Sequence, residues 1–249
     1  MVANPYTSWF RRGDISLEQA RAFVVQFSVF SNQFLIAQLK KMLNAETVQA
    51  MRESKEILVN GLGVGLRGGR NEDTDLGSAS GTVEGGTFHF RAAHFELLVR
   101  TAQGLGLCFD DLGKRRFATQ PTLLFCNELI RLFGHDDYAI ATAASWAVEN
   151  WAAGGFWDQL VQGWEIFRAR GNLAKLNLGF FAWHARLEAN HAWHTWDKLR
   201  QWYEEHDVDE DAFVMHANEM LDAVRVFWHG LDRQRRDIAA AANALDAVS

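Results

Sequence analysis

The segment from residue 184 to residue 194, HARLEANHAWH, carries three of the nine histidines in the chain and one glutamate. An α-helix turns by about 100° per residue, which places Glu188 and His191 roughly 40° and 20° from His184. These three residues would therefore share one stripe of a helix, whereas His194 would lie about 80° away, at its edge. Imidazole and carboxylate together suit iron, manganese or zinc. On its own the stretch is more typical of a structural helix, so a metal site needs matching ligands elsewhere.

Two further stretches offer such ligands. In GTFHFRAAHFELL, His94 lies among apolar side chains, and its simplest role would be that of a hydrogen-bonded core histidine. In SWAVENWAAGGFW, Glu149 is flanked by tryptophans, where a carboxylate is costly to bury unless it is paired, protonated or bound to a cation. The cost of burying all these groups would fall if they met at one metal centre. Helical bundles build metal sites in this way, from side chains on facing helices.

The elements that must position these residues are predicted from apolar periodicity and from capping signals. Ser16 and Gln19 form a capping-box pattern at the start of the first helix, and Pro121 suits the first turn of the fourth. We predict about seven helices: 16–44, 46–59, 86–104, one starting near 121, 136–170 with a bend at Gly154 and Gly155, 173–205, and 209 to the C-terminus.

No alternating strand pattern or internal repeat is evident, so the predicted fold is all-α, with residues 1–249 in one domain. Residues 61–86 hold nine of the twenty glycines and are predicted to form a mobile loop. This loop contains a literal G-x-G-x-x-G at Gly63, Gly65 and Gly68. A dinucleotide site needs a strand before that motif and a helix directly after it, so we interpret the glycines as a crossover loop.

Composition limits the classes of protein that the chain can belong to. With 48% hydrophobic and 12% aromatic residues it can bury a sizeable core. Its net charge of −6 gives no basic stripe, so we expect no nucleic-acid partner. The N-terminus lacks the apolar core of a signal peptide, and no window reads as a membrane span. Two cysteines are too few for a disulfide framework or a cysteine-based zinc site. The expected location is cytoplasmic.

The residues that carry a family resemblance are the motif H184-x-x-x-E188-x-x-H191, preceded by Phe180-Phe181, together with Glu149 and the stretch F90-R-A-A-H94-F-E-L-L98. On these residues, the sequence resembles the haem-oxygenase-like diiron oxidases and oxygenases, including the CADD-like proteins. The order of these residues matches that family over roughly residues 50–200. Family members usually carry Asp in the middle of the last motif, where this chain has the longer Glu188. The resemblance implies a seven-helix haem-oxygenase-like bundle that binds two iron ions, with O₂ as cosubstrate.

The resemblance also implies a set of metal ligands. His94, with one or two of Glu56, Glu84 and His191, would hold one iron. Glu149 would bridge the two ions or lie close to both, and His184 and Glu188 would complete the second site; spacing does not fix how the last motif is divided between the irons.

Glu84 is the first choice for the first carboxylate and, with Glu149, the expected catalytic carboxylate. Glu56 would be an additional ligand, with Glu53 as its alternative. Whether iron or manganese would occupy the site stays open. Glu96 and Glu128 are expected to face solvent or to pair with Arg100 and Arg131.

Bound iron of this kind activates O₂ while the protein provides placement and a dry pocket. The predicted pocket walls are Phe88, Trp146, Trp151, Phe181 and Trp183. Relatives act on amino acids, fatty acids or aromatic acids by N-oxygenation, oxidative decarboxylation or C–C cleavage. Arg91 could bind a substrate carboxylate, and Arg186 is a second candidate. The expected partners are a small-molecule substrate and an external electron donor, and a homodimer would be compatible with the fold.

Three other interpretations compete with the diiron prediction. A metal-free enzyme like the thiaminase-II or PqqC-type relatives would leave Glu149 and the last motif unexplained, and the thiaminase version would need Cys126 as a nucleophile. A CADD-like interaction protein without catalysis would need a large exposed apolar patch. A haem oxygenase proper would need a proximal histidine near the N-terminus, but the first histidine is His89.

Overall fold

The computed structural model describes the backbone of residues 4–66, 78–79 and 88–246. Side chains are described there except at 64–66, 78–79, 88–91, 187–198, 201 and 246. Within these ranges the chain forms nine α-helices: α1 (Pro5–Phe10), α2 (Leu17–Leu43), α3 (Val48–Gly61), α4 (His94–Gly104), α5 (Gln120–Phe133), α6 (Tyr138–Ala152), α7 (Phe156–Arg170), α8 (Gly179–Glu205) and α9 (Glu210–Asp246). Two short 3₁₀ turns, Phe109–Asp111 and Arg115–Phe117, connect α4 to α5.

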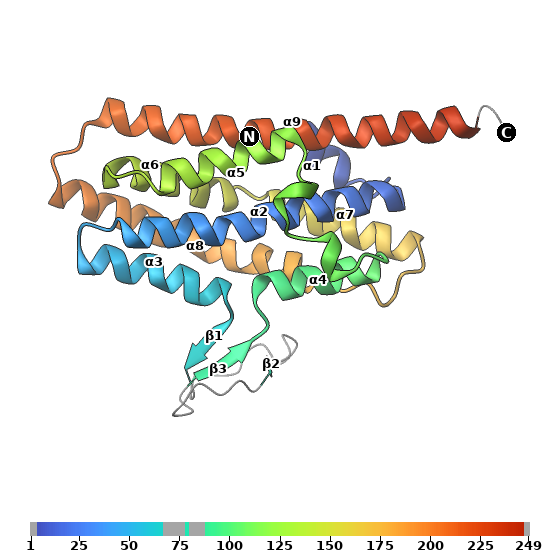
Figure 1. The fold of residues 1–249 in the computed structure, drawn as a ribbon, viewed down its shortest axis with the longest axis horizontal. Helices are drawn as coiled ribbons and strands as arrows, with labels where there is room; N and C mark the ends of the chain where they lie inside the picture. Colours follow the sequence, from blue (N-terminus) through green and yellow to red (C-terminus); the bar gives the residue numbers. More distant parts are fainter. Residues whose placement is uncertain (1–3, 67–77, 80–87, 247–249) are drawn as a thin grey trace.

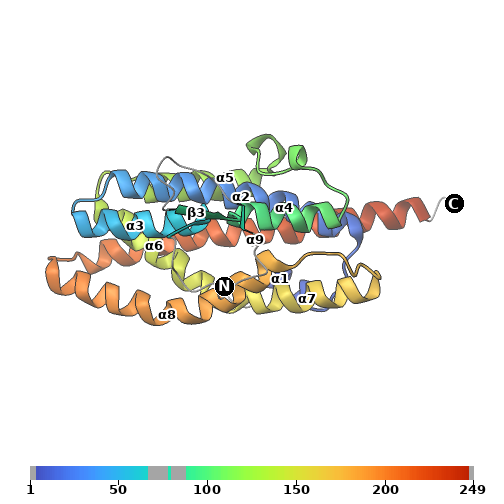
Figure 2. The same cartoon turned by 90° about the horizontal axis from the view of Figure 1, so that it is seen from below.

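Most helices run along the long axis of one bundle (Figure 1). The helix α9 extends along its whole length and projects beyond it at the C-terminus. The helices α7 and α8 lie along one side, whereas α2, α3 and α4 lie along the other (Figure 2). The most extensive helix contacts join α9 to α5 and α6, and α2 to α3 and α5. The all-α prediction is confirmed in these ranges.

The helix α2 is the central aromatic helix of the core. Ser16 and Gln19 form the predicted capping box, with Ser16 Oγ accepting from the Gln19 backbone N–H at 3.2 Å. Phe23, Phe27 and Phe30 are all buried within the bundle. Contrary to the expectation from the sequence, α2 is long and apolar enough to cross a membrane by length and composition alone. Because 56% of its most apolar window is buried inside the protein, its apolar surface is explained by core packing.

A small antiparallel sheet, absent from the prediction, lies next to the ends of α3 and α4 (Figure 1). Its strands are β1 (Val64–Leu66), β2 (Ser78–Ala79) and β3 (Phe88–Arg91), in the order β1-β3-β2. The helix predicted from residue 86 therefore begins only at His94. The stretch FHFR alternates apolar and polar residues, the period of a strand, and this short signal was overlooked. The rest of the predicted 61–86 loop lies outside the described residues.

Two predicted helices are shorter than expected. The helix predicted for 136–170 is divided into α6 and α7, because Gly155 adopts a left-handed φ of 84°. Such a conformation interrupts a right-handed helix and favours glycine. The helix predicted from residue 173 begins only at Gly179, whose backbone N–H donates to the Asn177 side chain at 2.8 Å. Pro121 lies in the first turn of α5, as predicted.

The N-terminal helix α1 was not predicted because six residues are too few to show a helical period. It packs closely on α7: a Cβ at Gly163 would overlap the Phe10 carbonyl. The Phe10 ring lies 5.2 Å from that of Trp164. This contact fixes the position of α7 in the bundle. Trp157, at the start of α7, belongs to the site described next.

Candidate functional site

His94 is the first residue of α4, directly after the sheet. Its helix start is defined by Ala93, whose backbone N–H donates to the Glu96 carboxylate at 3.2 Å. The His94 ring lies 4.1 Å from the Trp183 ring and 5.0 Å from the His184 ring, measured between centroids. Its Nε2 atom is buried and makes no hydrogen bond to the residues that the structure describes. A polar nitrogen is thus held inside the protein with an unused bonding position.

Burial of His94 lowers the pKa of its ring from 6.5 to about 4, because the charged imidazolium is poorly solvated there. The ring is therefore neutral at physiological pH. A neutral imidazole has one nitrogen lone pair, which is what a metal ion requires of a histidine. The prediction of an ordinary hydrogen-bonded core histidine fits Nε2 poorly.

His184 lies in α8, within the first two turns of that helix. Its Nδ1 is 2.7 Å from the Phe180 carbonyl oxygen. Because a carbonyl only accepts, Nδ1 must carry the hydrogen, and the lone pair of the neutral ring lies on Nε2. A backbone carbonyl fixes the tautomer of many metal-ligating histidines in this way. The ring is held between aromatic side chains, with centroids 4.5 Å from Trp157 and 4.4 Å from Phe180.

Both histidines line a cavity of about 140 Å³ between α2, α3, α4, α6, α7 and α8. Its walls are largely apolar and aromatic, from Phe27, Phe30, Phe34, Leu35, Ile57, Phe95, Val148, Trp151, Ala152, Trp157, Phe180 and Trp183. Its polar and small lining residues are Ser31, Gln38, Asn60, Gly61, His94, Glu149 and His184. The structure thus gathers three of the predicted ligands, from α4, α6 and α8, at one cavity.

Glu149 also lines a second, larger cavity of about 660 Å³ between α3, α6 and α8. Glu56, which is exposed, and Glu53 line this second cavity and not the first. The Glu53 carboxylate also accepts from the Gln49 side chain at 2.9 Å. Among these carboxylates, Glu149 alone reaches the cavity that holds the two histidines.

Other predicted residues cannot be placed. Glu84 lies outside the described residues. Phe88 and Arg91 lie in β3, and Glu188 and His191 in α8, but their side chains also lie outside the described part. The helix α8 is continuous from 184 to 191, so the predicted helical spacing of the motif is confirmed for the backbone. Among the described side chains, no group of three or more His, Cys, Asp and Glu residues is arranged for a metal ion.

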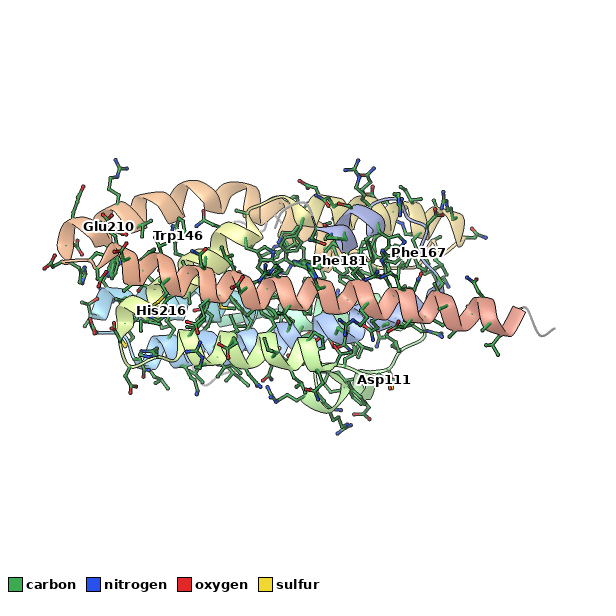
Figure 3. The ribbon with its side chains drawn as sticks, turned by 90° about the horizontal axis from the view of Figure 1, so that it is seen from above. Asp111, Trp146, Phe167, Phe181, Glu210 and His216 are labelled. Atoms are coloured by element: carbon green, nitrogen blue, oxygen red, sulfur yellow. The ribbon has the colours of Figure 1, made fainter. Side chains whose placement is uncertain are left out.

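The residues predicted to form pocket walls are divided between the two cavities and the core. Trp151 and Trp183 line the first cavity, whereas Trp146 lines the second. Phe181 lines neither of the two cavities and is fully buried in the core, 5.5 Å from the Trp164 ring. Figure 3 shows Phe181 well separated from Trp146 along the bundle. Neighbouring positions on a helix face different directions, and Phe180 faces the cavity in its place.

Three solved structures have the same architecture. A TenA homolog from Pseudomonas syringae has a TM-score of 0.68 at 12% identity, covering 93% of this chain and 86% of that one. A domain of unknown function with a heme oxygenase-like fold, from Shewanella denitrificans, has a TM-score of 0.63 at 12% identity, covering 93% and 85%. The chain has the haem-oxygenase-like fold.

A CADD-like protein of unknown function from Nostoc punctiforme shares this fold, with a TM-score of 0.58 at 18% identity, covering 89% of this chain and 82% of that one. No protein-family model and no curated protein matches the sequence. At these identities the comparisons establish the haem-oxygenase-like fold and leave the activity to be argued from the site.

Sequence reasoning missed several residues of this site in the haem-oxygenase-like bundle. Trp157 and Phe180 pack on His184, and Gln38 and Asn60 add polar groups to the cavity. Gln38 had a signal in the sequence, because it continues the helical stripe of Phe27, Phe30 and Phe34 by one turn. A glutamine at such a position is expected to be buried and therefore to need hydrogen-bond partners.

Two residues considered in the competing interpretations have clear environments. Cys126 is fully buried, and burial raises the pKa of its thiol to about 12. It is therefore a core side chain with almost no reactive thiolate at neutral pH. Arg186 is exposed and lines neither of the two cavities. As predicted, Glu128 pairs with Arg131, at 2.6 Å, and Glu96 is exposed.

Proposed function

We propose that this protein is a non-haem diiron enzyme that uses O₂ to oxidise a small, carboxyl-bearing organic metabolite. The observation that carries the proposal is the convergence of His94, Glu149 and His184, from three helices, on one mostly apolar cavity. Ordinary core packing gives no reason to bring two histidines and a carboxylate together there, since each is costly to bury.

The chemistry of the donor set supports iron. His94 supplies a neutral imidazole whose buried Nε2 makes no hydrogen bond, and the His184 tautomer is fixed by the Phe180 carbonyl. With Glu149 these residues provide the mixed nitrogen and oxygen ligands that suit iron or manganese. Glu188 and His191, one and two turns further along α8, would complete the set, and Glu84 or Glu56 would supply the remaining carboxylate.

Iron bound by these residues would supply the activation of O₂, and an external donor would supply electrons that the substrate does not provide. The protein itself would position the ligand side chains and keep water out of the cavity. Trp157 and Phe180 pack against the His184 ring, and Trp183 packs against His94, which limits how either ring can turn. The apolar walls exclude water from the reacting groups and strengthen local electrostatic interactions. Reaction types open to such a site include N-oxygenation, oxidative decarboxylation and C–C cleavage.

The likeness in fold to a TenA homolog is the reason to consider the metal-free alternative, a thiaminase-II-like enzyme. A thiaminase-like reaction needs a cysteine thiolate that reaches its substrate. Cys126 is buried with a raised pKa, and Cys108, the other cysteine, is exposed on the turn before α5, away from both cavities. The alternative also gives no role to Glu149 or His184.

Metal analysis after anaerobic reconstitution with Fe(II) tests the proposal. The wild-type protein is expected to retain about two iron ions per chain, as in other bundle diiron sites. Glu149→Ala and His184→Ala are each expected to lower the occupancy to roughly half or less, because each removes a ligand. Adding O₂ together with candidate substrates should then give a transient visible absorption with the correct one.

The matched controls are His229→Ala and Glu165→Ala, which remove an exposed histidine and an exposed carboxylate away from both cavities. Both are expected to retain wild-type iron. A wild-type protein that binds no iron, even with candidate substrates present, would rule out the diiron function. Equal iron loss in the control variants would show that the losses at Glu149 and His184 are not specific to the site.

A further inference from the structure

Gln38 has a buried side-chain amide that the protein leaves without partners. It lies on α2, is 0% exposed and lines the cavity that holds the two histidines. Neither its amide nitrogen nor its amide oxygen makes a hydrogen bond within the described part of the protein. An amide buried in this way is costly unless something else satisfies it, and a group of this kind in a native protein calls for an explanation.

Two other buried glutamines on the same helix show what is unusual about Gln38. Gln26 donates to the Phe117 carbonyl at 2.9 Å and accepts from the Thr119 backbone N–H at 2.8 Å. Gln33 accepts from the Arg115 side chain at 3.1 Å. Both of these residues tie α2 to the connection before α5. Gln38 makes no such tie and instead presents its amide to the cavity.

The cavity separates Gln38 from the histidines. The residues of α2 that line the cavity run from Phe27 at one end to Gln38 at the other. The Phe27 ring centroid lies 5.6 Å from that of Trp157 and 6.0 Å from that of Phe180, and both of these rings pack on His184. Gln38 lies eleven residues further along α2, which corresponds to about 16 Å of helix. The candidate metal ligand His184 and the Gln38 amide therefore lie toward opposite ends of the part of α2 that lines the cavity.

The charge of the lining restricts what Gln38 can bind. Among the described residues that line this cavity there is no lysine or arginine, and the walls are mostly apolar. An ionised carboxylate would be desolvated there without a cation to pair with it. A glutamine amide offers one donor and one acceptor side by side. Its best complement is a neutral group with the same pair, namely a primary carboxamide or a protonated carboxylic acid.

We infer that Gln38 is the head-group site of the substrate: it binds a neutral carboxamide or carboxylic acid end, while an apolar chain extends from it toward the histidines. This inference rests on the proposed function, in that the cavity is taken as the substrate site. It assigns the substrate class as an elongated, mostly apolar molecule that enters with its carboxyl end uncharged. The part of the substrate nearest the histidines, remote from the head group, is the part that reacts. This placement excludes oxidative decarboxylation of the bound head group and leaves the reaction types that act on the remote part of the chain.

Binding of octanamide to the iron-free protein tests the inference, with calorimetry or quenching of the cavity tryptophans as the readout. Octanamide is expected to bind the wild-type protein, and Gln38→Leu is expected to weaken binding by about tenfold or more, as the loss of two neutral hydrogen bonds predicts. N,N-dimethyloctanamide, which can accept but not donate, and octanoate at pH 8 are each expected to bind more weakly than octanamide.

Gln26→Leu is the matched control, since it removes a buried glutamine from the same helix outside the cavity lining. It should leave octanamide binding unchanged but lower the free energy of unfolding, because it strands Phe117 and Thr119 backbone groups. Gln38→Leu should leave stability unchanged or raise it, because it removes an amide without partners. A Gln38→Leu protein that unfolds more easily than Gln26→Leu would indicate a structural role and contradict the inference.

Other outcomes would also overturn the assignment of Gln38. Equal binding of octanamide by the wild type and Gln38→Leu would show that the amide is satisfied by water alone. Tighter binding of octanoate than of octanamide would show that the site takes the ionised form, and no octanamide binding at all would remove the site. Because the assay uses iron-free protein, binding that depends on Gln38 in a protein unable to bind iron would remove the diiron function and retain the head-group site.

Discussion

The two cavity histidines differ in how their environment prepares them to act as ligands. His94 is kept neutral by burial alone, and no hydrogen bond to its Nε2 competes with a ligand. His184 is oriented by a backbone carbonyl from its own helix and by stacked aromatic rings. Both effects arise from the packing around each ring. His229, by contrast, is exposed on the surface of the bundle.

Burial of His94 makes the stability of the iron-free protein depend on pH. The unfolded chain protonates this histidine near 6.5 and the folded chain near 4, so the unfolded state binds more protons between these values. The free energy of unfolding is therefore expected to fall as the pH decreases from 7 to 5, by about 2 kcal/mol from this group. His184 is close enough that a charge on it would disfavour protonation of His94 further.

Urea unfolding of the wild type and of His94→Leu at pH 7 and pH 5 checks this expectation. Groups elsewhere contribute equally to both proteins, so the difference between the two isolates His94. Between pH 7 and pH 5 the free energy of unfolding of His94→Leu should fall by about 2 kcal/mol less than that of the wild type. The same loss in both proteins would mean that His94 is solvated enough to protonate normally in the folded state.

At the scale of the elements, the site depends on where helices begin and end. His94 begins α4 because β3 precedes it, and Trp157 reaches the cavity because α7 starts anew after α6. The sequence signals for these boundaries are short: FHFR for the strand and Gly154-Gly155 for the break. Periodicity over longer windows averages the strand signal away, which explains why the start of α4 was predicted too early. The glycine pair correctly located the interruption between α6 and α7, which is a break where the sequence predicted a bend.

The break between α6 and α7 is expected to need the left-handed conformation of Gly155. Gly155→Ala should lower the free energy of unfolding by about 1–2 kcal/mol, the cost of that conformation for a residue with a Cβ. No atom lies within 4 Å of where the Cβ would be, so steric overlap adds nothing to this cost.

Gly155→Asn is the comparison, because asparagine tolerates the left-handed region better than alanine does. In urea unfolding, Gly155→Asn should lower the free energy of unfolding by less than Gly155→Ala does. If both variants were as stable as the wild type, the chain would be able to pass from α6 to α7 without a left-handed residue.

At the scale of the whole molecule, the bundle brings together residues that are far apart in sequence. The cavity combines side chains from α2, α3, α4, α6, α7 and α8 around His94, Glu149 and His184. The haem-oxygenase-like fold supports such a cavity, but the fold is shared by proteins with different chemistry. The function therefore has to be tested through ligand binding by the whole protein.

A metal ion that joins several helices should stabilise the whole bundle. With free Fe(II) at about a hundredfold its dissociation constant, binding to the folded state alone adds about 2.7 kcal/mol. For a chain of this size that corresponds to a rise in thermal midpoint of roughly 5–10 °C. Anaerobic thermal unfolding with and without Fe(II) measures this shift.

The Glu149→Ala variant is the control for that shift, because it lacks a carboxylate at the cavity while every other carboxylate of the protein is retained. It should show little or no change in midpoint with Fe(II). An equal shift in the variant would place iron binding elsewhere on the protein, and no shift in the wild type would contradict the proposed metal centre.

The all-α class, most of the helices and the choice of His94, Glu149 and His184 as candidate ligands could be predicted from the sequence. These follow from local patterns: apolar period, capping residues and polar groups within apolar runs. The fold was needed to show that Glu149 lines the same cavity as the histidines, whereas Glu56 and Glu53 line only the second cavity. The tertiary structure also decided that Gln38 faces the same cavity without a partner. Such facts depend on which helices pack together and at what rotation, which no local pattern specifies.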